Sequence, residues 1–160
     1  MIRVQEQDFD PGSELARLEG GTEVGGVACF VGLVRDRAGA QPVSAMTLEH
    51  YPGMTERKLA EIEAEARSRW PLIDCLIIHR VGRLLPGERI VLVATAAGHR
   101  RDALEACQFL IDWLKTKAPF WKSEESPDGN RHWVEARASD DTAAERWVQK
   151  SETRNQKPEP

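Results

Sequence analysis

The chain has 160 residues, 41% hydrophobic and 30% charged, which is typical of a single soluble globular domain. The net charge of −4 and the pI of about 5.6 argue against a nucleic-acid binder, which needs a basic surface to displace counterions. No apolar run approaches the roughly 20 residues of a membrane span, and MIRVQEQDFD lacks the build of a signal peptide. We therefore expect a cytoplasmic protein with neither a membrane nor a nucleic-acid partner.

The first half of the chain predicts strands and helices in alternation. Asp10 as N-cap and Pro11 at the first helical position predict a helix that runs to about residue 18. Residues 25–34, GGVACFVGLV, are apolar and rich in β-branched side chains, as in a strand. The remaining expected elements are a short strand at 2–4, a strand at 45–50 and an amphipathic helix at 54–69.

The second half continues this pattern and ends in a polar tail. Buried strands are expected at 74–81 and 89–96, and a hairpin at 120–125 and 132–136. A helix is expected at 100–117, with an inner face made of Leu104, Cys107, Leu110, Ile111 and Leu114. These elements predict an α+β fold with a mixed or antiparallel sheet. Residues 1–148 are expected to form one domain, and residues 149–160 a disordered tail.

The cysteines and histidines give no sign of a metal site. Cys29, Cys75 and Cys107 are far apart in apolar segments and form no C-x-x-C motif, so we expect three reduced, buried side chains. The histidines lack metal-ligand spacing, and no glycine-rich phosphate loop is present. We therefore expect neither a metal nor a cofactor.

Lysines lie on both sides of an Ala-Pro-Phe-Trp corner in the segment KTKAPFWK. Lys115 lies in the last turn of the predicted 100–117 helix, where interaction with the helix dipole would by itself explain it. Lys122 follows the aromatic pair in an extended segment. A lysine held beside another cation and partly withdrawn from water has a lowered pKa, which suits proton transfer or covalent chemistry. Lys115 and Lys122 are therefore candidate catalytic residues.

Two further charged segments lie at the ends of predicted strands. GHRR, residues 98–101, spans a strand-to-helix junction, where free N–H groups and the helix dipole favour an anion. Ion pairs with Asp102 or Glu105 would explain its arginines equally well. Arg35 ends the strand FVGLVR and begins a loop, a common place for ligand contacts, although an ordinary exposed arginine is the simpler interpretation. Together with the lysines, these segments predict a pocket for a phosphate-bearing molecule.

Six segments follow one another across most of residues 25–137: GGVACFVGLVRD, LEHYPGM, IHRVGRLLPGE, VATAAGHRRDALEAC, LKTKAPFWKSE and WVEA. In this order they resemble the family of molybdopterin synthase large (catalytic) subunits. The combination of FVGLVRD, GHRR and KTKAPFWK is specific to that family.

The resemblance implies an activity, a partner and a fold. Members of this family take sulfur from a small ubiquitin-like partner subunit, which carries it as a thiocarboxylate on its C-terminal Gly-Gly. They transfer the sulfur to cyclic pyranopterin monophosphate and so form the dithiolene of molybdopterin, in molybdenum cofactor biosynthesis. The large subunit is a homodimer within a heterotetramer. The family fold is an α/β hammerhead with a small additional β-rich lobe.

The resemblance also implies which residues form the site. Lys115 and Lys122 match the two active-site lysines of the family. The matching substrate-binding residues are Leu33, Val34, Arg35, His99, Arg100, Ser123 and Glu124, with Phe30 and Arg137 as weaker candidates. The family resemblance further implies that His99 and Arg100 reach the pocket across the dimer interface.

Such a pocket must bring two anions together, the phosphate and the thiocarboxylate, and cations would offset their repulsion. We expect His99 and Arg100 to bind phosphate. Lys115 is expected beside the tail carboxyl and the pterin carbon under attack, and Lys122 is expected to orient the precursor. The aromatic pair in KTKAPFWK is expected to hold Lys122 and to limit water around it.

Three other functions fit parts of the sequence. A non-catalytic module that binds a ubiquitin-like tail explains the aromatic corner, but not the lysines and the His-Arg pair together. A Schiff-base enzyme acting on a phosphorylated carbonyl compound would use one of the two lysines. Nucleic-acid binding is disfavoured by the net charge.

Overall fold

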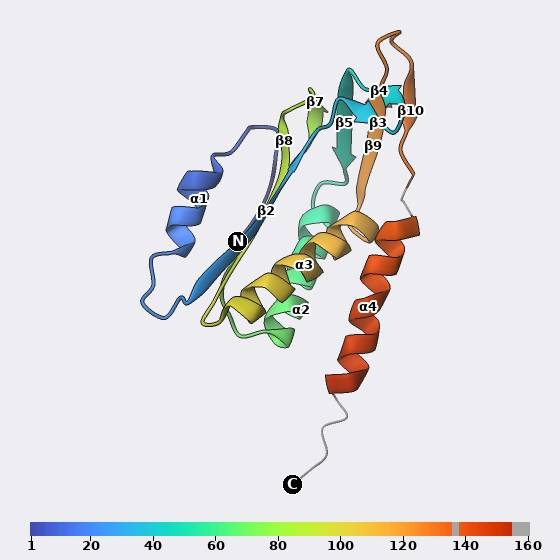
Figure 1. The fold of residues 1–160 in the computed structure, drawn as a ribbon. Coiled ribbons are helices and arrows are strands. Elements are labelled where there is room, and N and C mark those ends of the chain that lie inside the picture. Colours follow the sequence, from blue (N-terminus) through green and yellow to red (C-terminus); the bar gives the residue numbers. More distant parts are fainter. Residues whose placement is uncertain (136–137, 155–160) are drawn as a thin grey trace.

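A mixed four-stranded sheet runs through the centre of the computed structural model, which describes residues 1–135 and 138–154 (Figure 1). Strand β1 pairs in parallel with β6, whereas β6 and β2 both pair with β8 in antiparallel orientation. The strands, in their order across the sheet, are β1 (Ile2–Gln5), β6 (Leu72–Arg80), β8 (Arg89–Ala97) and β2 (Gly26–Leu33).

A second, antiparallel sheet forms a smaller β-rich part at one end of the molecule (Figure 1). Its strands, in order, are β10 (Arg131–Trp133), β9 (Phe120–Glu125), β5 (Ala45–His50) and β7 (Gly82–Leu84). A short hairpin of β3 (Arg37–Ala38) and β4 (Gln41–Pro42) lies in the segment predicted to be a loop. The α+β class with a mixed main sheet and a small β-rich lobe is therefore confirmed.

Helices cover both faces of the main sheet. Helix α1 (Pro11–Leu18) lies on one face, and α2 (Met54–Arg69) and α3 (Arg100–Thr116) lie on the other (Figure 1). Side chains of β6 alternate between two apolar clusters, because successive residues of a strand point to opposite faces. Burial of both faces explains why the central residues of β6, 75–78, are all apolar. No helix in the described ranges is long and apolar enough to cross a membrane.

Local signals set the starts of α1 and α2. The carboxylate of Asp10 accepts a hydrogen bond from the Ser13 N–H at 3.3 Å, which confirms the predicted N-cap. Helix α2 begins after Gly53, whose φ of +82° favours glycine. The Gly53 N–H donates to the Glu56 carboxylate at 2.7 Å, which satisfies a backbone donor at the helix start.

The inner face of α3 is turned relative to the prediction. Cys107 and Leu110 are buried as expected, but Leu104 is 61% exposed, so its assignment to the core is wrong. Ala103 and Ala106 are buried instead, one residue before and two residues after Leu104. Each residue turns a helix by about 100°, and the small alanine side chains let α3 lie close to the sheet.

A fourth helix, α4 (Ala138–Arg154), docks on α3, where the sequence predicted no helix. The buried carboxylate of Asp112 accepts hydrogen bonds from Trp147 Nε1 at 2.7 Å and from the Arg146 guanidinium at 2.6 Å. The ring of Trp147 packs edge-on against Phe109, with the ring centroids 5.5 Å apart. Tertiary contacts of α4 with α3 thus stabilise a segment with little apolar periodicity of its own.

Two further expectations differ from the structure. Helix α4 occupies residues 149–154, where the sequence predicted the start of a disordered tail; the rest of that tail, residues 155–160, lies outside the described residues. Cys29 is exposed, so the prediction of a buried thiol is wrong for this residue, whereas Cys75 and Cys107 are buried.

Candidate active site

The two candidate lysines line the same cavity, which has a volume of about 320 Å³. Lys115 lies in the last turn of α3, and Lys122 lies on β9. The helix ends where the Lys117 N–H donates to the Trp113 carbonyl at 2.8 Å, and the proline that follows prevents its continuation. The chain then returns along the second sheet. The other charged side chains that line this cavity in the described part of the chain are Arg35, Arg37, Glu124, Glu135 and Asp140.

The protonation of Lys122 is shifted by its surroundings. Burial first, and then the positive charge of Lys115, lower the pKa of Lys122 from 10.5 to about 8. The carboxylates of Asp140 and Glu124 act in the opposite direction. Lys122 can therefore exchange a proton near neutral pH, which an ordinary surface lysine does not do.

Aromatic stacking positions the start of β9. The ring of Phe120 stacks on the imidazole of His79, with the ring centroids 3.7 Å apart and the planes at 12°. His79 comes from β6 of the main sheet and is buried, so the stack joins the two sheets beside Lys122. Trp121 is 47% exposed. Phe120 therefore anchors this segment, and the expectation that both aromatic residues do so is wrong for Trp121.

The end of β2 brings Arg35 to the cavity. Leu33 is 53% exposed and lines both this cavity and a second one of about 260 Å³, which Phe30 also lines. Val34 points the other way into the core and lines neither cavity, so the structure does not support its expected contact with a substrate. Successive side chains of an extended segment point to opposite faces, so Val34 points away from the cavity that Leu33 and Arg35 line.

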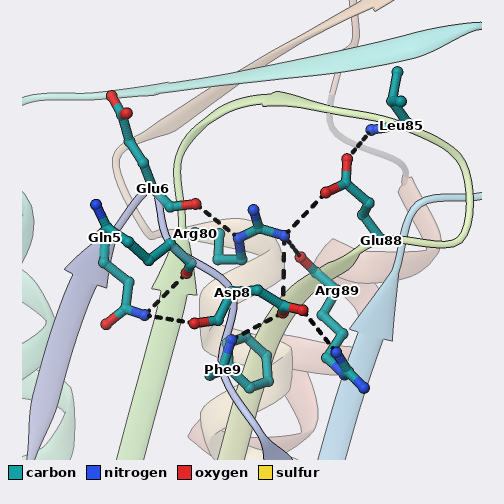
Figure 2. Close-up of polar contacts among 9 residues, drawn as sticks. Gln5, Glu6, Asp8, Phe9, Arg80, Leu85, Glu88 and Arg89 are labelled. Atoms are coloured by element: carbon teal, nitrogen blue, oxygen red, sulfur yellow. Dashed lines mark hydrogen bonds and ion pairs between the residues drawn. The ribbon is translucent and has the colours of Figure 1, made fainter.

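The buried side chain of Arg80 contacts the turn at residues 85–88, between β7 and β8 (Figure 2). Arg80 donates from Nε to the Glu6 carbonyl at 2.9 Å and from a terminal nitrogen to the Arg89 carbonyl at 3.1 Å. The same terminal nitrogen lies 3.6 Å from Glu88 and 3.9 Å from Asp8, whose carboxylates balance its charge.

This turn reaches Arg35 through the backbone. The Val34 N–H donates to the Glu88 carbonyl at 2.9 Å, and the Gly87 N–H donates to the Val34 carbonyl at 2.8 Å. Val34 directly precedes Arg35, so the turn that Arg80 contacts fixes the point at which the Arg35 side chain leaves the strand.

Ser123 and Glu124 lie on opposite faces of β9. Glu124 lines the cavity with Lys122, and its carboxylate lies 3.5 Å from His132 Nε2 on the neighbouring strand. Ser123 lines neither cavity and accepts a hydrogen bond from Arg131 at 3.1 Å. The expected substrate contact is thus supported for Glu124 and not for Ser123, because the strand alternates.

His99 and Arg100 lie far from the lysines within one chain. They stand at the N-terminal end of α3, and the 15 residues from Arg100 to Lys115 span about 22 Å along the helix axis. Both side chains are exposed and line neither cavity. Arg101 forms the alternative ion pair with Glu105, at 3.2 Å.

Reasoning from the sequence missed several residues of the cavity. Arg37 lies in the predicted loop, and Asp140 lies in a helix that was not predicted. His79 was judged only for metal-ligand spacing, although it occupies a buried strand beside the lysines. Its position in an otherwise apolar run was the available signal. Arg137 lies outside the described residues.

Comparison with known proteins places these features in a family. The family model described as "MoaE protein" matches residues 4–117, which includes Arg35 and Lys115 but ends before Lys122. Relatives extend further along the chain. The chain is 56% identical over 147 residues to the molybdopterin synthase catalytic subunit of Ralstonia nicotianae, covering 91% of this chain and 83% of the relative.

Two other proteins show the same likeness. The molybdopterin synthase catalytic subunit of Pseudomonas aeruginosa is 54% identical, covering 91% of this chain and 97% of the relative. A solved structure, the molybdopterin biosynthesis MoaE protein from Burkholderia ambifaria, is 56% identical with a TM-score of 0.79. The match covers 92% of this chain and 97% of that one.

Proposed function

The chain belongs to the MoaE protein family, and on that premise we propose that it is the catalytic subunit of a molybdopterin synthase, which transfers sulfur in molybdenum cofactor biosynthesis. The proposed acceptor is cyclic pyranopterin monophosphate. The proposed donor is the thiocarboxylate on the C-terminal Gly-Gly of a small ubiquitin-like partner subunit. The chain works as a homodimer within a heterotetramer, in the cytoplasm.

The observation that carries this proposal is the shared cavity of Lys115 and Lys122. Arg35 and Arg37 line the same cavity, so it gathers four cationic side chains in a protein whose net charge is −4. Glu124, Glu135 and Asp140 line the cavity as well, so among the described residues its cations exceed its carboxylates by one, and this positive excess favours the entry of anions. A phosphate and a thiocarboxylate are two anions that would otherwise repel each other.

The lysines divide the work in the proposed mechanism. Lys115, at the exposed end of α3, lies beside the tail carboxyl and the pterin carbon under attack, and it stabilises the charge that develops there. Lys122 orients the precursor and assists the opening of its cyclic phosphate. The lowered pKa of Lys122, about 8, supports a role in proton transfer. Two C–S bonds form on the pterin, and the C–S bond of each donor thiocarboxylate is broken by water, which leaves an ordinary carboxylate on the tail. Each product molecule therefore consumes two thiocarboxylated tails.

A second copy of the chain completes the site. His99 and Arg100 are proposed to bind the phosphate, yet they stand about 22 Å along α3 from Lys115 in their own chain. An isologous two-fold dimer places the same surface of each copy against the other, and it can thereby bring the His-Arg pair of one copy to the lysines of its partner.

The test is a reconstituted reaction analysed by mass spectrometry. The purified protein is mixed with the cyclic pyranopterin precursor and a thiocarboxylated partner, and the pterin is assayed for added sulfur. We expect a product with two sulfur atoms. A partner that binds without any gain of sulfur in the pterin would contradict the proposal and would indicate the non-catalytic binding module.

A further inference from the structure

A buried histidine lies beside the two lysines and has no role in the mechanism proposed above. His79 is 5% exposed on β6, and it lines the second cavity together with Lys115 and Lys122. Its ring stacks on Phe120 at 3.7 Å, which fixes the plane of the imidazole. A polar ring held in place at the wall of a cavity can direct a hydrogen bond into that cavity.

The backbone fixes the tautomer of this ring. Nδ1 of His79 lies 2.8 Å from the carbonyl oxygen of Arg80. A carbonyl oxygen can only accept, so Nδ1 carries the hydrogen and donates it. Nε2 of a neutral ring then has a free lone pair. Within the described ranges no side chain or N–H group donates a hydrogen bond to Nε2. Nε2 is also not fully enclosed, because it is absent from the buried polar atoms that lack a partner.

Strand geometry brings Lys122 to the same cavity as this lone pair. Phe120 and Lys122 are two residues apart on β9, so their side chains leave the same face of the strand about 7 Å apart. The His79 ring is stacked on Phe120 and therefore lies next to the Lys122 side chain. An ammonium group has three hydrogens, so Lys122 can donate to Nε2 and still contact other groups.

We propose that His79 is a positioning residue for Lys122: its free Nε2 accepts a hydrogen bond from the Lys122 ammonium and holds that group in the cavity. The two residues line one cavity, and whether they form this hydrogen bond can be tested without a substrate. Its importance for turnover rests on the proposed function, in which Lys122 orients the precursor. An acceptor that carries no charge can hold an ammonium among other cations without adding to their repulsion.

The surrounding charges keep His79 suited to this task. Burial first, and then the positive charges of Lys122 and Lys115 and the neighbouring His50, lower the pKa of His79 to about 3, against the backbone contact with Arg80. The ring is therefore neutral at physiological pH. Lys122 is faced by Lys115 from α3, His79 from β6, Glu124 from β9 and Asp140 from α4. The other charged groups that line its cavity in the described residues are Arg35, Arg37 and Glu135.

The first measurement concerns the tautomer in the wild-type protein and needs no substrate. Nitrogen-15 spectra of labelled histidine distinguish a ring nitrogen that carries hydrogen from one that does not. We expect His79 to be protonated at Nδ1 and bare at Nε2 from pH 8 down to pH 5. A hydrogen on Nε2 would overturn the proposal, because that nitrogen could not then accept.

The second measurement is the titration of Lys122 itself, followed by lysine side-chain NMR and assigned by the signal lost in Lys122→Met. His79→Phe keeps a ring for the stack and removes both nitrogens. It should lower the pKa of Lys122 by about one pH unit, because an acceptor that favours the ammonium has gone. His79→Gln offers an amide oxygen as acceptor and should restore part of this difference. Equal midpoints in the wild type and His79→Phe would overturn the proposal.

Sulfur transfer provides a separate readout. We expect His79→Phe to lower kcat about tenfold with little change in KM, and His79→Gln to recover part of the rate. If wild-type protein transfers no sulfur, the proposed function fails while the two NMR results still decide the contact. If it does, and His79→Phe has the wild-type kcat, the positioning role is refuted. His79→Gln serves as the working variant if His79→Phe does not fold.

Discussion

Arg100 and Lys115 lie at opposite ends of helix α3, about 22 Å apart along its axis. Both carry positive charge, but only Lys115 lines the cavity that it shares with Lys122. A helix is stiff over this length, so no rearrangement of side chains brings the two groups of one chain together. If both act on one substrate, they must come from two copies.

This separation predicts complementation between two inactive variants. Arg100→Ala and Lys115→Ala should each lose at least 100-fold in sulfur transfer, because each lacks a cation that meets the anions. An equimolar mixture with subunit exchange should recover about a quarter of wild-type activity, since half of the dimers are mixed and one of their two sites is intact. The measurement is the rate of sulfur gain before and after exchange.

Lys117→Ala is the matched control, because Lys117 is exposed near Lys115 and lines neither cavity. It should keep the wild-type rate. If both groups acted within one chain, each site of a mixed dimer would carry one defect. The exchanged mixture would then stay inactive, and the shared site would be disproved.

Lys122 predicts a dependence of stability on pH. Its pKa is about 8 in the folded protein and near 10.5 in an unfolded chain, so the unfolded state binds more protons between these values. Stability therefore rises as pH increases from 8 to 10.5, and the destabilising effect of the buried charge is fully present below pH 8. Lys122→Met should be more stable than the wild type by about 3 kcal/mol at pH 7, and this advantage should disappear by about pH 10.5.

Urea unfolding at pH 7, 9 and 10.5 measures this difference. Lys117→Met removes an exposed lysine of the same segment and should track the wild type at every pH. A Lys122→Met variant with a constant offset from the wild type across this range would show that Lys122 titrates normally in the folded protein.

A side chain added at Gly25 is predicted to clash with the backbone just before His99. A Cβ atom at Gly25 would lie 2.0 Å from the carbonyl oxygen of Gly98, which is far inside contact distance. Gly25→Ala should therefore destabilise the protein by about 1–3 kcal/mol. Gly20→Ala is the control, since its nearest contact would be an ordinary 3.7 Å to the Arg17 carbonyl. Equal unfolding midpoints in the two variants would contradict this account.

The hydrogen bonds that Asp112 accepts are expected to attach α4 to α3. Asp112→Ala removes the buried carboxylate that accepts hydrogen bonds from Trp147 and Arg146, and it should lower the free energy of unfolding by about 1–3 kcal/mol. Hydrogen exchange of the α4 amides should accelerate more than that of α3. The exposed Glu145→Ala in the same helix should change stability by less than about 0.5 kcal/mol. Unchanged exchange in Asp112→Ala would show that other contacts hold α4.

The sequence was most informative where the local pattern is unambiguous. The N-cap at Asp10, the strand Ala45–His50 and the helix Met54–Arg69 are found as predicted, because capping and periodicity act within a few residues. Leu104 was placed on the wrong face of α3, because which side of a helix is buried depends on the sheet beneath it. Helix α4 was missed because its stability comes from contacts with distant residues such as Asp112.

Some residues of the candidate site could be predicted from the sequence, and others could not. The segment KTKAPFWK and its family resemblance identified Lys115 and Lys122, and the strand end identified Arg35, all of which line one cavity. That Lys122 and the buried His79 line one cavity could not be predicted, because the two residues lie 43 positions apart on strands of different sheets.

By itself, the sequence predicted the α+β class, because this class depends on short-range pattern. Its resemblance to a known family indicated that family and the candidate lysine pair. Only the tertiary structure decided which cations share a cavity, which expected contacts point away from it, and how far Lys122 departs from ordinary basicity. These properties depend on distance and burial, which the packing of separate segments sets.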